Sequence, residues 1–348
     1  MAAAMLFPVK ALGVSAQKAI VLDSASGRVL YGKLQNERSL IASTTKIMTA
    51  LVVCQQCNVL DRFRIPKEAV GIEGSSMYLK EGEILTIQEL LYGLMLQSGN
   101  DAAVALAIYC GGTVEGFVQM MNDKAALLGL SNTYFANPHG LDASNHYSTA
   151  RDLAVLSAYA MSDPIFSMTV STKTVTVGER YLKNHNKLLW RIEGADGVKT
   201  GYTKAAGRIL VSSVSRDNRR LICVTINAPD DWNDHIKLLE HCYRNYKSVT
   251  FVSEGQSVGR VYIAGGTSGW VDLIAAETFE LALADNENVV LEMPGIGFVY
   301  APIKAGEEAG IANVLIDGQY VGSVKLLFGE TVKQYRESKH SIWQKFFG

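Results

Sequence analysis

The sequence predicts an α/β protein of the α+β type, with one domain built from an antiparallel sheet and a helical subdomain and a small all-β domain after it. Three observations support this prediction. Strand-like segments stand at both ends of the first 250 residues, and helical patterns fill the stretch between them. From about residue 250 the helical signal is lost, and short apolar runs alternate with Gly-rich turns. The length of 348 residues exceeds what one compact core usually needs.

The first elements are a hairpin and a series of helices. Residues 18–22 and 28–32 are short apolar runs on either side of a Ser- and Gly-containing turn, which predicts a β-hairpin. The run that begins at Ser43 is apolar nearly all round, which predicts a buried helix. The motif Thr86-Ile-Gln-Glu89 is a capping box and predicts a helix up to Gln97. Further helical patterns cover residues 101–110, 114–128 and 149–161.

After residue 170 the periodicity changes to that of strands. Residues 174–177 alternate between polar and apolar, and residues 208–214 and 220–226 flank a turn at Asp217-Asn218, which predicts an antiparallel pair. Residues 231–246 then predict a helix with an acidic first turn. Early and late strands therefore belong to one sheet.

We divide the chain into a leader (1–16), a serine peptidase domain (17–250), a β-rich domain (251–331) and an amphipathic tail (332–348). The leader is apolar and ends in small residues, which is typical of a truncated signal peptide and predicts a secreted, extracytoplasmic protein. A disordered leader is the alternative, since Lys10 interrupts the apolar run. No other stretch approaches the ~18 apolar residues that a spanning helix needs.

Composition excludes some classes of partner and chemistry. Lys plus Arg total 33 and Asp plus Glu total 34, so no global basic field attracts nucleic acid. The odd number of cysteines, five, and their scattered positions argue against a disulfide framework. The histidines lack metalloprotease spacing, and we expect no metal and no cofactor.

Three short motifs carry the candidate chemistry: Ser43-Thr-Thr-Lys46, Ser98-Gly-Asn100 and Lys199-Thr-Gly201. The first pattern alone is weak, because Ser-x-x-Lys occurs by chance roughly once in a chain of this length. The segment Ser15-Ala-Gln-Lys18 is such a chance occurrence. The other two motifs are each expected on the order of a tenth of a time, so all three in order form a strong signal.

The residue types suit nucleophilic catalysis. Residues i and i+3 share a helix face, so Lys46 can reach the Ser43 hydroxyl. A serine hydroxyl becomes a good nucleophile only when a base takes its proton. Lysine can act as that base if its pKa falls, and burial together with the nearby cation Lys199 lowers it.

The second and third motifs supply polar groups around this pair. Ser98 and Asn100 follow a helix end, where a short loop can direct both side chains into a cleft. The third motif lies on a strand, and Gly201 lets a substrate backbone approach the strand edge closely. Three unrelated polar spots are the alternative, since motifs are hypotheses until their context is known.

Longer strings around these motifs resemble a known family: Ala42–Thr49, Ser98–Ala103, His139-Gly-Leu-Asp142 and Asp196–Gly201. Over nearly its whole length from residue 17, the sequence resembles the low-molecular-mass penicillin-binding proteins, the serine D-Ala-D-Ala carboxypeptidases. The resemblance implies a β-lactamase/transpeptidase-like fold. It also implies peptidoglycan stem peptides as substrates and β-lactam antibiotics as covalent inhibitors.

The resemblance further implies an acyl-enzyme mechanism. Ser43 attacks the carbonyl between the two terminal D-alanines, and Lys46 accepts its proton. Ser98 relays a proton toward the leaving amine, while Asn100 and Lys199 fix the network. Backbone N–H groups of Ser43 and Tyr202 form the oxyanion hole. The implied substrate-binding residues are Lys199, Thr200, Gly201, Tyr202 and Thr203, with Thr200 and Thr203 holding the terminal carboxylate.

The sequence departs from the family pattern in two places. Some relatives have His where this chain has Tyr202, and residues 228–232 lack the arginine that can follow the later strand. Arg208 and His185 are the candidates for carboxylate recognition. In the string His139-Gly-Leu-Asp142 the Asp either orients loop and lysine groups or stabilises a turn.

The tail and two other functions remain open alternatives. Residues 332–348 combine basic and aromatic residues at helical spacing, which favours an interfacial helix on an anionic membrane. Docking on the chain's own β-domain is the other interpretation. A class A β-lactamase shares two of the motifs, but residues 130–170 lack its deacylation motif and its class has no C-terminal β-domain. A β-lactam or peptidoglycan sensor that acylates without turnover is the third hypothesis.

Overall fold

The computed structural model describes residues 12–295 and 297–336, and the chain divides into two compact units between Asn245 and Tyr246. The sequence predicts this boundary after residue 250 instead. The structure has it earlier because β10 (Lys247–Val252) pairs with β13 (Phe279–Leu283) of the second unit. Each unit is described by itself.

The first unit is built on an antiparallel sheet. Within the described residues this sheet has five strands in the order β2-β1-β9-β8-β7. They are β1 (Lys18–Asp23), β2 (Val29–Lys33), β7 (Ala195–Thr203), β8 (Gly207–Arg216) and β9 (Arg219–Ile226). The early hairpin pairs with the late strand β9, so the predicted mixing of early and late segments is confirmed. Two small two-stranded sheets pair β3 (Arg62–Arg64) with β4 (Ile84–Thr86), and β5 (Thr174–Val177) with β6 (Arg180–Lys183).

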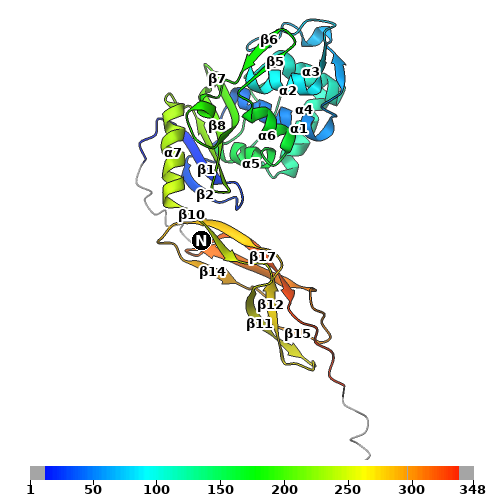
Figure 1. Ribbon diagram of the computed structural model, residues 1–348, viewed down its shortest axis with the longest axis vertical. Coiled ribbons are helices and arrows are strands. Elements are labelled where there is room, and N and C mark those ends of the chain that lie inside the picture. Colours follow the sequence, from blue (N-terminus) through cyan, green and yellow to red (C-terminus); the bar gives the residue numbers. More distant parts are fainter. Residues whose placement is uncertain (1–11, 296, 337–348) are drawn as a thin grey trace, which may run out of the picture. The chain divides into compact units, whose positions relative to one another are not determined.

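Helices cover both faces of this sheet, with α7 on one side and the helical subdomain on the other (Figure 1). They are α1 (Lys46–Gln56), α2 (Ile87–Leu96), α3 (Asn100–Gly111), α4 (Val114–Leu127), α5 (Ala150–Ala160), α6 (Pro164–Ser171) and α7 (Asp231–Asn245). The sequence pattern does not predict α6. This helix has only eight residues and begins at a proline, with the Asp163 carboxylate capping its first turn.

Helix α1 lies at the centre of the first unit. Its residues from Lys46 to Cys54 are all buried, as the apolar sequence predicts. The predicted start is wrong, because Ser43 lies in a separate 3-10 turn, η1 (Ala42–Thr45), and α1 begins at Lys46. Residues i and i+3 eclipse each other in a 3-10 turn. The turn therefore brings Ser43 and Lys46 together even more directly than an α-helix does.

The end of the predicted leader is part of the first unit. The Asp234 carboxylate accepts hydrogen bonds from the Ser15 backbone N–H (2.9 Å), the Ser15 hydroxyl (2.7 Å) and the Ala16 N–H (2.8 Å). Lys18 instead donates to the Ser39 hydroxyl at 2.7 Å, so the second Ser-x-x-Lys segment does not form a Ser–Lys pair. Residues 1–11 of the predicted leader lie outside the described residues.

The second unit is all β, as predicted. Its described strands form a pair, β10-β13, and a larger sheet in the order β14-β16-β17-β12-β11-β15. The further strands are β11 (Ser257–Ala264), β12 (Trp270–Ala275), β14 (Val289–Glu292), β15 (Phe298–Tyr300), β16 (Glu308–Ile316) and β17 (Gln319–Phe328). Val332, the first residue of the predicted tail, is buried and exchanges two backbone hydrogen bonds with Ile303. Residues 337–348 of the tail lie outside the described residues.

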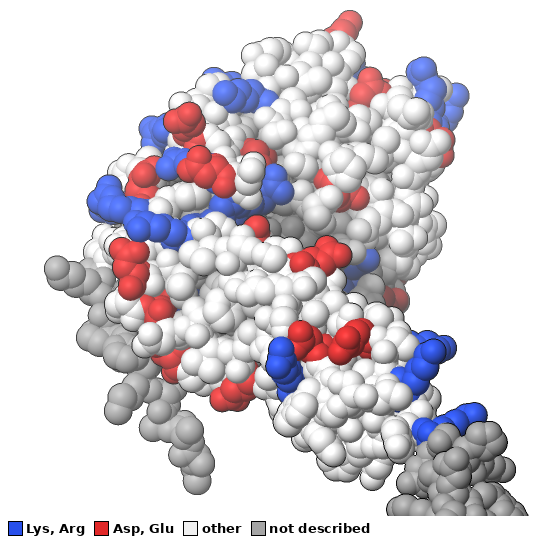
Figure 2. Space-filling view, turned by 60° about the horizontal axis from the view of Figure 1, so that its bottom comes forward, with Lys and Arg blue, Asp and Glu red and all other residues white. Residues whose placement is uncertain are grey.

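The surface carries both signs of charge. On the face in Figure 2, Lys and Arg side chains lie interspersed with Asp and Glu. In the described part of the chain, no single helix is both long and apolar enough to cross a membrane. The bent pairs α3–α4 and α5–α6 reach that length and apolar character only when the two helices of a pair are counted together.

A buried histidine makes the stability of the first unit depend on pH. His235 of α7 lies between the side chains of Ser212 (2.6 Å) and Thr225 (3.0 Å), and burial lowers its pKa from 6.5 to about 3. The unfolded chain therefore binds a proton that the folded chain does not, and stability falls as the pH drops from about 6.5 toward about 3.

We expect His235→Gln to be less stable at neutral pH but to lose less stability on acidification. Urea unfolding at several pH values between about 7 and 5 measures the slope. His241→Gln, on the same helix but partly exposed, is the matched comparison. Burial and then Arg244 lower the pKa of His241 as well, so this variant is expected to flatten the slope less than His235→Gln does. Equal slopes in the parent and the His235 variant would contradict this account.

Candidate active site

The Lys46 amino group is held by three segments of the chain. Its Nζ lies 3.1 Å from the Ser43 Oγ, 2.6 Å from the Asn100 Oδ1 and 2.6 Å from the His139 carbonyl oxygen. The two carbonyl oxygens can only accept hydrogen bonds, so they take two N–H groups. In a neutral amine the remaining position, which faces Ser43, holds the lone pair. The arrangement can therefore accept the serine proton.

The environment favours this neutral amine. Lys46 is fully buried, and its pKa falls well below the ordinary 10.5, chiefly through burial and then through the charge of Lys199. The carboxylate of Asp101 acts in the opposite direction. Lys199 is also buried, which lowers its own pKa to about 7. The two causes predicted from sequence, burial and a second cation, are both present.

The Ser98–Asn100 segment links the end of α2 to the start of α3. Ser98 has a positive φ of 62°, a conformation that L-residues rarely adopt, and its mostly buried side chain lines the cleft with Ser43. The Asn100 Nδ2 donates to the Glu73 carbonyl at 2.6 Å, which fixes the amide so that its oxygen faces Lys46. One short loop thus places Ser98 on the wall of the cleft and Asn100 against Lys46.

The neighbouring Asp101 holds a second segment, residues 75–79, against the start of α3. The sequence motifs did not indicate this role. The buried Asp101 carboxylate accepts hydrogen bonds from the Ser76 hydroxyl (2.6 Å) and from the backbone N–H groups of Met77 and Leu79 (3.0 Å each). The backbone N–H of Asn100 donates to the Ser75 carbonyl at 2.7 Å. Residues 75–79 are therefore tied to the start of α3.

Strand β7 passes directly beside η1, the turn that carries Ser43 and that we call the nucleophile turn. A Cβ on Gly201 would lie 3.3 Å from the backbone nitrogens of Ser43 and Thr44, closer than most real Cβ contacts. A side chain at this position would push the turn away by a few tenths of an ångström, so glycine favours the close approach. Lys199 Nζ donates to the Thr200 carbonyl at 3.0 Å and, within the described structure, makes no hydrogen bond with Ser43.

The loop that contains His139-Gly-Leu-Asp142 supplies the His139 carbonyl. A Cβ on Gly140, whose φ is 91°, would overlap the Ala42 carbonyl oxygen, so glycine lets the loop pass beneath the nucleophile turn. Asn137, which the sequence analysis did not single out, accepts from the Gly140 N–H at 2.7 Å and so sets the loop conformation. Asp142 accepts from the Thr203 hydroxyl at 3.2 Å and contacts no lysine in the described structure.

A second histidine supports the turn from below. The Nδ1 of His146 accepts from the Ala136 N–H at 3.0 Å, so its Nε2 carries the proton and donates to the Thr45 hydroxyl at 2.7 Å. That hydroxyl donates to the Ala42 carbonyl at 2.8 Å. Burial, and then the charge of Lys46, lowers the pKa of His146 to about 4. A lone histidine carries no sequence signal for this role.

These groups border a cleft of about 360 Å³. It is lined by Ser43, Ser75, Ser98, His185, Lys187, Thr200, Gly201, Tyr202, Arg208, Ile209, Asp231 and Trp232. Arg208 pairs with Asp231 at 2.9 Å, and its guanidinium lies 6.0 Å from the centre of the Trp232 ring. Both sequence candidates for carboxylate recognition, Arg208 and His185, thus reach the cleft.

Comparison with known proteins assigns the family. The family model for D-alanyl-D-alanine carboxypeptidase matches residues 6–230. The chain belongs to this family of low-molecular-mass penicillin-binding proteins. The model for the C-terminal domain of penicillin-binding protein 5 matches residues 246–334. A class A β-lactamase is not favoured, because the β unit matches the C-terminal domain of penicillin-binding protein 5.

Individual carboxypeptidases are similar over almost their whole length. The chain is 33% identical to the D-alanyl-D-alanine carboxypeptidase DacF of Bacillus subtilis, over 96% of this chain and 92% of that protein. It is 33% identical to DacC of Escherichia coli, over 94% of this chain and 86% of that protein. The crystal structure of penicillin-binding protein 5 from Haemophilus influenzae superposes with a TM-score of 0.82 at 30% identity, covering 92% of this chain and 98% of that one.

The coupling between the two lysines predicts a pH effect. Because the charge of Lys199 lowers the pKa of Lys46, Lys199→Met raises that pKa. We expect the acidic limb of the β-lactam acylation profile to move to higher pH, together with a lower maximal rate. Acylation rates by benzylpenicillin between about pH 5 and 10 measure it. Lys204→Met, an exposed lysine beyond the same strand, is the control; an unmoved limb in the Lys199 variant would rule the coupling out.

Proposed function

We propose that the protein is a serine-type D-Ala-D-Ala carboxypeptidase that removes the terminal D-alanine from peptidoglycan stem peptides through an acyl-enzyme. The observation that carries the proposal is the pairing of the Ser43 hydroxyl with the buried, pKa-lowered amine of Lys46. Family membership and the 33% identity to carboxypeptidases over both units support it.

In the first step Ser43 Oγ attacks the carbonyl carbon of the penultimate D-alanine while its proton passes to Lys46 Nζ. The carbonyl oxygen becomes an oxyanion, and the backbone N–H groups of Ser43 and Tyr202 are the proposed donors to it. The close approach of β7 at Gly201 supports this, because it brings the two backbones side by side.

The tetrahedral intermediate then collapses to the ester of Ser43 and expels D-alanine. The leaving amine needs a proton, and Ser98, which lines the cleft beside Ser43, relays it from Lys46. Asn100 and Lys199 keep the network in place. Water then attacks the ester, with Lys46 again accepting a proton, and Ser43 is regenerated.

The substrate's terminal carboxylate is bound by hydroxyl and cationic groups of the cleft. Thr200 lies on its wall, and Thr203 follows on the same strand. Arg208 supplies a guanidinium that Asp231 holds in place while 44% of its side chain stays exposed. We propose that Arg208, on β8, provides the charge that relatives obtain from the segment after the later strand. His185 adds a neutral ring, since burial and then Lys199 lower its pKa.

The central test is covalent labelling together with product release. Intact-protein mass spectrometry with benzylpenicillin is expected to show one adduct in the parent and none in Ser43→Ala. Ser15→Ala removes the serine of the second Ser-x-x-Lys segment and is the matched control, with labelling unchanged. An adduct on Ser43→Ala would reject the nucleophile assignment.

Turnover separates the remaining functions in the same preparation. The parent releases D-alanine from a pentapeptide that ends in D-Ala-D-Ala. A sensor forms the adduct without this release, and a β-lactamase hydrolyses the penicillin rapidly instead. Absence of D-alanine release would overturn the carboxypeptidase function.

We also propose that the protein works outside the cytoplasm and contacts the membrane through its tail. Peptidoglycan is an extracytoplasmic substrate, and the leader is typical of a signal peptide. The tail joins basic residues at 333, 336, 339 and 345 to aromatic residues at 343, 346 and 347. Each such aromatic contributes ~1.5–3 kcal/mol on burial, and each basic residue near an anionic surface about 1 kcal/mol. The sum suits reversible surface binding.

Liposome co-sedimentation tests the tail. A chain that ends at Arg336 keeps the Val332–Ile303 pairing of the second unit and lacks the aromatic residues. We expect the full chain to sediment with anionic vesicles, less so in high salt, and the shortened chain to stay in solution with normal pentapeptide cleavage. Equal sedimentation of the two chains would show that the tail is not the anchor.

A further inference from the structure

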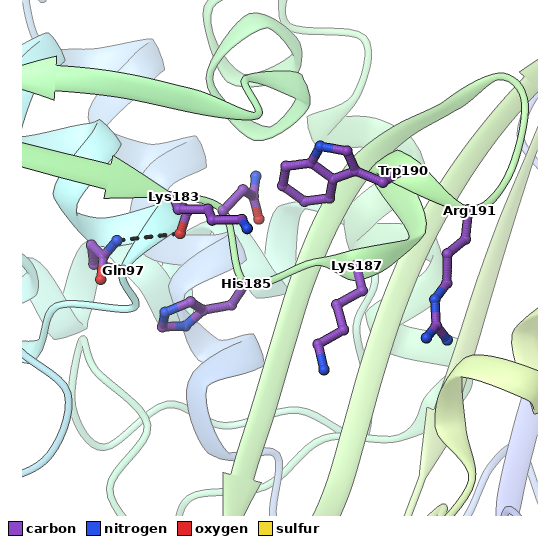
Figure 3. Close-up of a pocket in the computed structure, with 7 residues that line it drawn as sticks. Gln97, Lys183, His185, Lys187, Trp190 and Arg191 are labelled. Carbon is purple, nitrogen blue, oxygen red and sulfur yellow. Dashed lines mark hydrogen bonds between the residues drawn. The ribbon is translucent and has the colours of Figure 1, made fainter.

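A larger hollow adjoins the catalytic cleft. It has a volume of about 720 Å³ and shares His185 and Lys187 with the cleft lining, so the two spaces are neighbours at these residues. Figure 3 shows its side chains on and around the loop that follows β6. The lining residues are Gln97, Lys183, Asn184, His185, Lys187, Trp190 and Arg191.

Exposed and buried side chains alternate along residues 183–187, which border the hollow. Lys183, His185 and Lys187 are exposed, whereas Asn184 and Asn186 between them are buried. Successive side chains of an extended segment point to opposite sides, so the three basic-type residues share one face. Lys183, His185 and Lys187 therefore form a row of side chains that lines the hollow.

The buried asparagines make the row rigid. Asn184 Nδ2 donates to the carbonyls of Val170 (3.1 Å) and Thr172 (3.0 Å), and Asn186 Nδ2 donates to the Gly197 carbonyl (2.7 Å). Their backbones are tied as well, since the Asn184 N–H donates to the Lys173 carbonyl at 2.9 Å. A preorganised surface loses little entropy when a ligand binds.

The hollow is cationic and has one aromatic wall. Lys183, Lys187 and Arg191 have no ion-pair partner among the described residues, and no Asp or Glu lines the space. Trp190 is 45% exposed, and the Lys183 ammonium lies 5.5 Å from the centre of its ring. Free cations beside an exposed indole suit a ligand that carries carboxylates along an apolar or sugar-like backbone.

We propose that this hollow, which we call the basic annex, binds a carboxylate-bearing segment of peptidoglycan while the D-Ala-D-Ala end occupies the catalytic cleft. The inference rests on the proposed function, because peptidoglycan is the polymer that the cleft would receive. The carboxylate comes either from an acidic residue of the stem peptide being cut or from a second stem peptide cross-linked to it.

Equilibrium binding to the Ser43→Ala chain tests the annex independently of turnover. The probes are two pentapeptides ending in D-Ala-D-Ala that differ only in a free carboxylate or a carboxamide on their internal acidic residue. We expect the acid to bind more tightly. The preference is the ratio of the two dissociation constants, amide over acid. In a Ser43→Ala chain that also carries Lys183→Gln and Arg191→Gln, we expect this ratio to be about three- to tenfold smaller, as for the loss of two exposed charge contacts.

Matched variants separate charge from structure. Lys67→Gln removes an exposed lysine that lines neither space and should keep the parent preference. Lys183→Arg with Arg191→Lys keeps both charges and should restore most of it. A cross-linked peptide dimer, tested against its amidated form, distinguishes the sources: an effect confined to the dimer assigns the annex to the second stem peptide.

The two proposals fail in different ways. Two outcomes would overturn the annex, if they hold for both the pentapeptide pair and the dimer pair. One is equal affinity for the acid and the amide, and the other is an unchanged preference when Lys183→Gln and Arg191→Gln are added. D-alanine release by the parent chain would stand in that case. Missing D-alanine release with an intact acid preference would instead overturn the carboxypeptidase and keep the annex as a peptide-binding site.

Discussion

Lys46 brings an ionisable amine into the apolar centre of the first unit, where burial lowers its pKa and three distant segments must supply its partners. The nucleophile turn, the start of α3 and the His139 loop each contribute one hydrogen-bond partner. An unpaired buried amine would be strongly destabilising. The contacts that satisfy Lys46 are therefore the same contacts that assemble the site.

Close backbone approach is the second requirement, and small residues meet it. Gly201 lets β7 lie against the nucleophile turn, and Gly140 lets the His139 loop pass beneath Ala42. Asp101 and His146 then hold the surrounding loops with buried hydrogen bonds. Asp101 and His146 do not line the cleft, yet they hold the loops from which its polar groups project.

Local patterns made much of this predictable. The hairpin, the buried helix and the capping box follow from short-range periodicity, and the three motifs name the residues that the structure gathers around Ser43. The sequence missed short or isolated features and long-range contacts. Helix α6 is too short for a periodic signal, and Asn137 sets its loop through a local hydrogen bond to Gly140 that no pattern marks. Strand β10 is assigned by its pairing with β13, and Asp101 and His146 act through hydrogen bonds to residues far along the chain. The alternation of basic residues and asparagines at 183–187 is visible in the sequence too. That these basic residues line a hollow is visible only in the structure.

Two buried lysines raise the question of which one is the base. Lys199 has the pKa of about 7, but its Nζ donates to the Thr200 carbonyl, whereas Lys46 lies 3.1 Å from the Ser43 hydroxyl. Geometry therefore selects Lys46. A charge on Lys199 disfavours a charge on Lys46, so the two amines titrate as a coupled pair rather than independently. The second lysine thus acts through the first, because its charge lowers the pKa of Lys46 and keeps the lone pair of that amine available.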